Sequence, residues 1–113
     1  MISIYKDNIF LIKSKLCNNF FSKGLGLMFT FNPQSALLVN NSESIISSNI
    51  HMFFMFYSID VYWLNKNFEV VNKKLNLKPF TFNHSSKYPA MYILEVPVNS
   101  ISLDIGDKIE IKR

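Results

Sequence analysis

The chain contains a single cysteine, Cys17, so it can form neither an intramolecular disulfide nor a cysteine-based metal site. The two histidines, His51 and His84, are far apart in the sequence and belong to no metal-binding motif such as HExxH. A zinc site usually needs three or four convergent ligands at suitable spacing. We therefore expect neither a bound metal nor another cofactor.

Long hydrophobic runs are also missing. No window approaches the roughly 18 uncharged apolar residues that a membrane span requires. The closest is HMFFMFYSIDVYWLN, residues 51–65, which His51 and Asp60 interrupt. Near the start, Lys6 and Asp7 lie where a signal peptide would carry its apolar segment. Together with the lone cysteine, these absences predict a cytoplasmic protein without a membrane partner.

Arginine is nearly absent, because Arg113 is the only one among 12 basic residues. With 8 acidic residues the net charge is +4, which alone would be compatible with a polyanionic partner. Bidentate recognition of phosphates and bases, however, usually uses Arg. The abundance of Asn, Ile, Phe and Lys is typical of an AT-rich genome, which accounts for the basic charge. We do not expect a nucleic-acid partner. The alternative is a weak nucleic-acid surface formed by Lys73, Lys74, Lys78 and Lys87.

What the chain does contain is apolar and aromatic residues, at 49% and 15%, which suffice for the core of one domain spanning residues 1–113. The apolar segments are short and rich in β-branched and aromatic residues, as strands are. Helix is scarce, with short helical turns expected at 19–23 and 101–105, and the polar tract 40–49 is expected to be an exposed loop. The fold class predicted is all-β, a small single-domain β barrel or sandwich with one or two short helical turns. The expected strands are 9–15, 36–39, 61–64, 68–71, 92–96 and 108–112, with 61–64 and 68–71 forming a hairpin.

The glycines carry no nucleotide-binding motif. The segment GLGLM lacks the third glycine of a dinucleotide-binding loop and the Lys-Ser/Thr end of a P-loop. Gly24 and Gly26 are therefore expected to allow a tight turn. Gly106 and Asp107 are expected to form the turn into the last strand.

Asp60 stands among large apolar residues in the segment 51–65, which we expect to break near Tyr57-Ser58 because a strand of 52–64 would be unusually long. A buried carboxylate must be hydrogen-bonded, paired or protonated. One interpretation is that Asp60 accepts backbone N–H groups of the preceding turn. The other is a site carboxylate with a perturbed pKa in an apolar cleft. The first is favoured.

The predicted function is a binding or interaction module without catalysis. Its ligand site is expected in an apolar groove around His51, Met55 and Asp60, for an unknown small ligand or protein partner. The alternative is a small enzyme in which Asp60 acts with His51 or Glu95. Glu95, however, lies in the middle of an expected strand and is equally explained by a position facing solvent.

Three blocks of the sequence resemble the family called domain of unknown function 192, found in bacteria and archaea. They are GLMF at 26–29, the segment 51–65, and YILEV at 92–96 together with IGDKI at 105–109. The resemblance covers about residues 10–112 and implies a compact all-β domain without an established activity. The chain departs from the family pattern at Thr30, Ser58 and Asn65, where relatives commonly have a basic residue, Pro and Asp. If those residues form a site in relatives, this chain lacks part of it.

Overall fold

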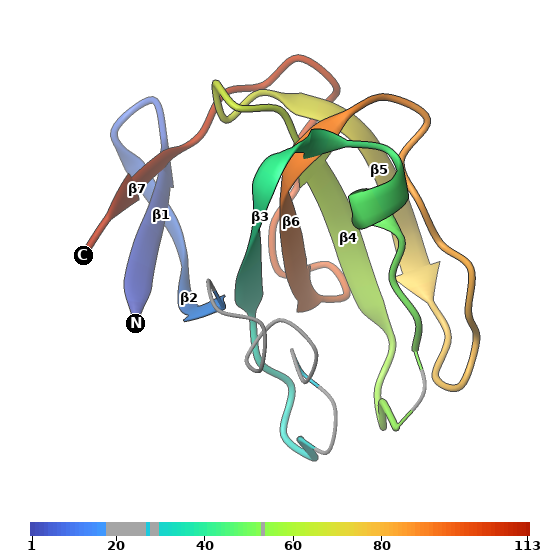
Figure 1. The fold of residues 1–113 in the computed structure, drawn as a ribbon. Coiled ribbons are helices and arrows are strands. Elements are labelled where there is room, and N and C mark those ends of the chain that lie inside the picture. The colour runs from blue at the N-terminus through green and yellow to red at the C-terminus, as the bar shows by residue number, and fades with distance from the viewer. Residues whose placement is uncertain (18–26, 28–29, 53) are drawn as a thin grey trace.

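The computed structural model describes residues 1–17, 27, 30–52 and 54–113, and seven strands of this part of the chain form one sheet. The sheet order is β5-β4-β6-β3-β2-β1-β7, and every neighbouring pair is antiparallel except β2 and β3. The sheet curls into a half-barrel, which confirms the all-β prediction (Figure 1). The elements are β1 (Ile2–Lys6), β2 (Ile9–Cys17), β3 (Ala36–Ser44), the 3-10 helix η1 (Ile46–Ser48), β4 (Ile59–Leu64), β5 (Val70–Leu77), β6 (Ala90–Pro97) and β7 (Glu110–Lys112).

The predicted hairpin of β4 and β5 is present, but its second arm begins at Val70 instead of Phe68. The Asn65 side-chain Oδ1 accepts the backbone N–H groups of Asn67, at 2.9 Å, and Glu69, at 3.1 Å. Phe68 has a positive φ of 62°, which ends regular strand geometry there. The loop is thus longer because the Asn65 side chain organises it.

Strand β1 was not predicted. It pairs with β2 through a tight turn at Asp7 and Asn8, whose φ angles are 51° and 64°. Two consecutive positive φ angles are typical of a type I′ hairpin turn, for which Asp and Asn are well suited. The Asp-Asn pair is therefore the signal that would have located this hairpin.

Two other expectations are wrong. Residues 40–44 continue β3 rather than forming a loop, and Ser44 pairs with Ala90 of β6. No helical turn forms at 101–105, because Ile101 and Leu103 are both buried and the chain between them runs extended with alternate residues facing the core. The expected helical turn at 19–23 and the turn at Gly24 and Gly26 lie outside the described residues. No helix in the described part of the chain is long and apolar enough to cross a membrane.

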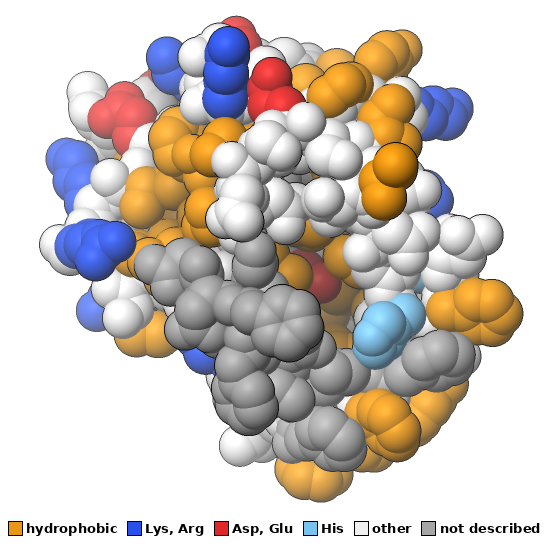
Figure 2. All heavy atoms as spheres, in the orientation of Figure 1, with side chains coloured by type: hydrophobic (Ala, Val, Ile, Leu, Met, Phe, Trp, Pro, Cys, Tyr) orange, Lys and Arg blue, Asp and Glu red, His pale blue; other side chains and the backbone are white. Residues whose placement is uncertain are grey.

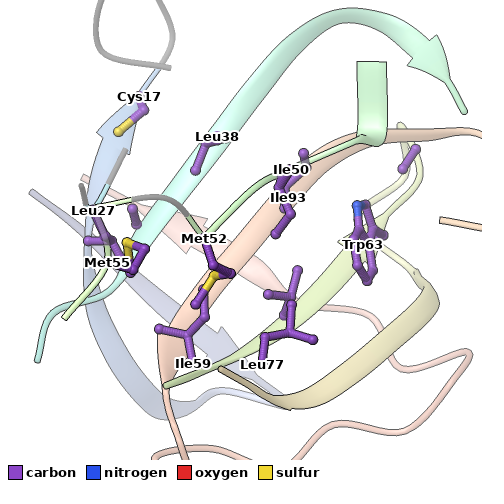
Figure 3. Close-up of a cluster of buried hydrophobic side chains, with 13 residues drawn as sticks. Cys17, Leu27, Leu38, Ile50, Met52, Met55, Ile59, Trp63, Leu77 and Ile93 are labelled. Carbon is purple, nitrogen blue, oxygen red and sulfur yellow. The ribbon is translucent and has the colours of Figure 1, made fainter. Parts of the chain in front are cut away.

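Each face of the sheet carries its own hydrophobic cluster, as the alternation along β4 shows. Ile59, Val61 and Trp63 point to one cluster, which also contains Met52 and Met55 (Figure 3). Tyr62 and Leu64 point to the opposite cluster, inside the half-barrel, with residues of β1, β6 and the segment before β7. We call the first the loop face, because residues of segments 45–52 and 54–58 pack over it and the Trp63 Nε1 donates a 2.8 Å hydrogen bond to the Ser48 carbonyl oxygen.

Candidate functional site

Asp60 is only 3% exposed and lies on the half-barrel side of β4. Its Oδ1 accepts the backbone N–H of Asn76 at 2.8 Å, and its Oδ2 accepts that of Asn99 at 3.0 Å. The carboxylate therefore joins the end of β5 to the turn after β6. The donors come from these two segments and not from the preceding turn, because β5 and β6 are the strands that flank β4.

The other residues of the predicted site lie elsewhere. Met55 is buried in the cluster on the loop face, on the opposite side of β4 from Asp60. His51 is exposed and precedes the buried Met52. Asp60 and Glu95 also face opposite sides, because the strand partner of Glu95 is Val61, the neighbour of Asp60. The structure thus does not bring Asp60 together with Met55 or Glu95.

Glu95 is the acidic residue that the structure places on the loop face. Its position in the middle of a strand was compatible with a side chain that faces solvent. Glu95 is instead only 6% exposed. Strand pairing puts it in the middle of a row across the sheet, between Ala36 of β3 and Val61 of β4. The row continues to Lys15 of β2 at one end and to Lys74 of β5 at the other. Since strands lie about 4.8 Å apart, each lysine backbone is about 10 Å from that of Glu95.

The environment of Glu95 favours its protonated form. Burial raises the pKa of Glu95 from 4.5 to about 7, and the positive charge of Lys15 offsets only part of this effect. Burial also raises the pKa of the Cys17 thiol, and the charge of Glu95 adds to that rise. Within the described part of the chain, no hydrogen-bond donor contacts the Glu95 carboxyl group, whereas Asp60 has two.

The lysines of the nucleic-acid alternative do not share one face. The Lys73 ammonium donates to the Leu103 carbonyl oxygen at 3.0 Å on the half-barrel side. The Lys74 ammonium lies 5.9 Å from the centre of the Trp63 ring on the loop face. Burial, and to a lesser degree the charge of Lys74, lowers the pKa of His84. Adjacent strand positions point to opposite faces, which is why these two neighbours separate.

A second concave surface lies beside the β4–β5 turn, an open groove of about 460 Å³. Both acidic residues that line it already stabilise the turn. Glu43 accepts the Lys66 backbone N–H at 2.8 Å, and Glu69 accepts the Asn65 amide at 3.0 Å. Gly106, with a φ of 95°, also lines the groove. No group of three or more potential metal ligands occurs among the described residues.

Asp107, next to Gly106, belongs to the turn before β7. Its Oδ2 accepts the Asp104 backbone N–H at 2.8 Å and a 2.9 Å hydrogen bond from the Lys6 ammonium. These bonds lower the pKa of Asp107, with the Asp104 N–H as the larger cause. The residue therefore connects the turn to β1.

The curled sheet with one buried carboxyl group on its loop face defines a small all-β domain. Residues 4–111 match the family DUF192, described as an uncharacterised ACR, and the chain belongs to this family. It is 35% identical to a UPF0127 protein of Pyrococcus furiosus, over 100% of this chain and 98% of the relative. A UPF0127 protein of Thermococcus sibiricus is 38% identical over 97% of this chain and 73% of its own length.

A solved structure of a protein of unknown function from Novosphingobium aromaticivorans superposes with a TM-score of 0.83. The superposition covers 96% of this chain and 82% of the solved chain. Because the two sequences are only 17% identical, the likeness concerns the fold alone. The family resemblance derived from the three sequence blocks is confirmed.

Proposed function

We propose that this protein is a non-catalytic binding module whose ligand contacts the Glu95 carboxyl group on the loop face. The observation that carries the proposal is the contrast between two buried acids. Asp60 has a backbone donor on each oxygen, and its burial is explained by the fold. Glu95 is buried among apolar residues with a raised pKa, and the sheet gains no hydrogen bond from it within the described residues. Among the described residues no donor contacts this buried carboxyl group, and leaving such a group without one is costly, which supports a ligand that supplies the donor.

The chemistry of this face supports a ligand with an apolar body and one hydrogen-bond donor, such as an amine or a hydroxyl group. The occupant, whether a small ligand or a protein side chain, would enter beside Met52 and Met55. Both are buried, and their flexible thioether side chains can rearrange to admit different shapes. In this proposal Met55 remains a ligand residue, as expected from the sequence, whereas Asp60 has a structural role. His51 is exposed and adjoins Met52 in the sequence.

Binding is favoured over catalysis because acid–base chemistry needs a second polar group within hydrogen-bond reach of the first. The partner considered for Glu95 was Asp60, and it points to the other side of the sheet. The carboxyl group of Glu95 is thus better suited to recognise a donor than to share a proton with Asp60.

The test uses protein labelled with ¹³C at the methionine methyl groups and three probes with the same ring: benzylamine, benzyl alcohol and benzoate. At pH 8, saturable shifts of the Met52 and Met55 signals are expected, strongest for benzylamine and weakest for benzoate. Glu95→Gln should abolish the preference for the amine, whereas Glu110→Gln, at an exposed position on β7, should preserve it. The signal of the exposed Met1 serves as the internal reference. The absence of saturable shifts, or the same order of affinities in Glu95→Gln, contradicts the proposal.

A further inference from the structure

One end of the molecule exposes phenylalanine side chains on three loops, at residues 30–34, 51–57 without residue 53, and 78–84. Hydrophobic side chains gather along the lower edge of the view in Figure 2. The most exposed rings are those of Phe31, at 74%, and Phe82, at 65%. Apolar patches of this kind on a protein surface mark interaction sites. The patch, called the aromatic surface below, consists of Phe31, Phe54, Phe56, Phe80 and Phe82.

The rings of the aromatic surface contact one another across the loops. Phe31 stacks on Phe56 with ring centres 4.7 Å apart and an interplanar angle of 19°. Phe80 meets Phe56 edge to face at 6.0 Å and 80°. These contacts join Phe31, Phe56 and Phe80, one residue from each loop, into a continuous cluster of rings.

Hydrogen bonds connect the loops that carry these rings. The backbone N–H of Met52 donates to the Thr81 carbonyl oxygen at 2.6 Å, and that of Phe80 donates to the Met52 carbonyl oxygen at 2.7 Å. The hydroxyl groups of Thr30 and Tyr57 are 2.8 Å apart and connect the remaining loop. A surface preorganised in this way loses little conformational entropy when it binds.

Two of the exposed rings also sit on strained backbone. Phe54 has a φ of 60° and Phe80 a φ of 64°, in the left-handed region that bulky residues rarely adopt. This conformation costs about 1–2 kcal/mol per residue. Each of the two residues remains about half exposed, at 49% for Phe54 and 55% for Phe80. Backbone strain of this kind concentrates at functional sites.

Charge indicates what covers the aromatic surface. The three loops contain neither Asp nor Glu, and the one formal charge on them is that of Lys78. Apolar rings with a basic residue beside them suit the headgroup region of an anionic bilayer, where apolar burial and electrostatic attraction act together. Base stacking suits the patch less well, because Phe31 and Phe80 already contact the ring of Phe56.

We infer that the aromatic surface binds peripherally to an anionic lipid bilayer, with its rings inserted between the headgroups. The sequence predicted no membrane partner because the chain has no spanning segment, and peripheral insertion requires none. This interaction is independent of the Glu95 site.

The experiment is flotation of the whole protein with vesicles of phosphatidylcholine alone or mixed 3:1 with phosphatidylglycerol. The wild type is expected to float with the mixed vesicles and less with the neutral ones. The double variant Phe31→Ser, Phe82→Ser should lower the partition coefficient at least tenfold. Lys78→Gln should lower it about fivefold on the mixed vesicles alone, since one basic residue near such a surface contributes about 1 kcal/mol.

Ile46→Ser is the matched control, because Ile46 is 89% exposed on η1, outside the aromatic surface. It should leave the partition coefficient unchanged, as should Glu95→Gln, and the emission of Trp63 verifies that each variant is folded. The inference is overturned if the wild type floats with neither vesicle, or if Ile46→Ser weakens binding as much as the double variant. It is also overturned if the phenylalanines instead support a dimer or salt-sensitive binding to single-stranded DNA.

Discussion

Replacing Glu95 by Gln is expected to remove a fall in stability between pH 5 and pH 8. The pKa of Glu95 is about 7 in the folded protein and near its ordinary value of 4.5 when unfolded. Between these values the folded state binds more protons than the unfolded state, so the free energy of unfolding decreases as the pH rises. The penalty is absent below about pH 4.5 and complete above about pH 7.

The magnitude follows from the size of the pKa shift. At about 1.36 kcal/mol per unit, a rise from 4.5 to about 7 corresponds to a penalty of about 3 kcal/mol at pH 8. The amide of Gln is not ionised and escapes this cost, although it still needs hydrogen-bond partners. The difference between wild type and Glu95→Gln should therefore shift by up to about 3 kcal/mol in favour of the variant between pH 5 and pH 8.

Urea unfolding at several pH values measures this difference, with the emission of Trp63, the only tryptophan and fully buried, as the probe. Burial lowers the pKa of His84, but His84 is present in both proteins, so its contribution cancels in the difference. The exposed Glu110→Gln variant is the control and should follow the wild type. Parallel pH profiles for wild type and Glu95→Gln would refute the reasoning.

Two further predictions concern buried polar groups. Asp60→Asn replaces one acceptor by an amide N–H that faces a backbone donor, so the free energy of unfolding should fall by about 2 kcal/mol or more in urea titrations. Asp7→Asn, at an exposed turn that suits Asn, should change it little, and equal losses in both variants would count against the structural role of Asp60. Cys17 is fully buried with a raised pKa, so its thiol should react slowly with Ellman's reagent until urea unfolds the protein. Fast reaction under native conditions would be inconsistent with this packing.

The sequence predicted the fold class and most strands because alternation and β-branched residues act locally. The apolar face of Tyr92, Leu94 and Val96 was correctly predicted in this way. The prediction that Ile109 and Ile111 point to the same side was also correct. Local patterns do not reveal which segment covers the other face of β6. Glu95 therefore appeared equally suited to solvent, whereas the structure buries it.

The partners of Asp60 were beyond local patterns for a related reason. Its two donors lie 16 and 39 residues further along the chain, and only the pairing of three strands brings them to β4. That Asp60 needs donors was predictable from the cost of burying a carboxylate. Which residues supply them depends on the strand order.

The pairing of β1 with β7 has a consequence for how the chain folds. Residues 3–5 pair with 110–112, so one margin of the sheet is assembled from segments at opposite ends of the sequence. Closing so long a loop costs entropy before the pairing contributes stability, which slows folding. A chain shortened before Glu110 would leave one edge of β1 without its partner, and such an edge is a template for intermolecular β pairing. The three residues of β7 thus protect the protein against aggregation as well as completing its sheet.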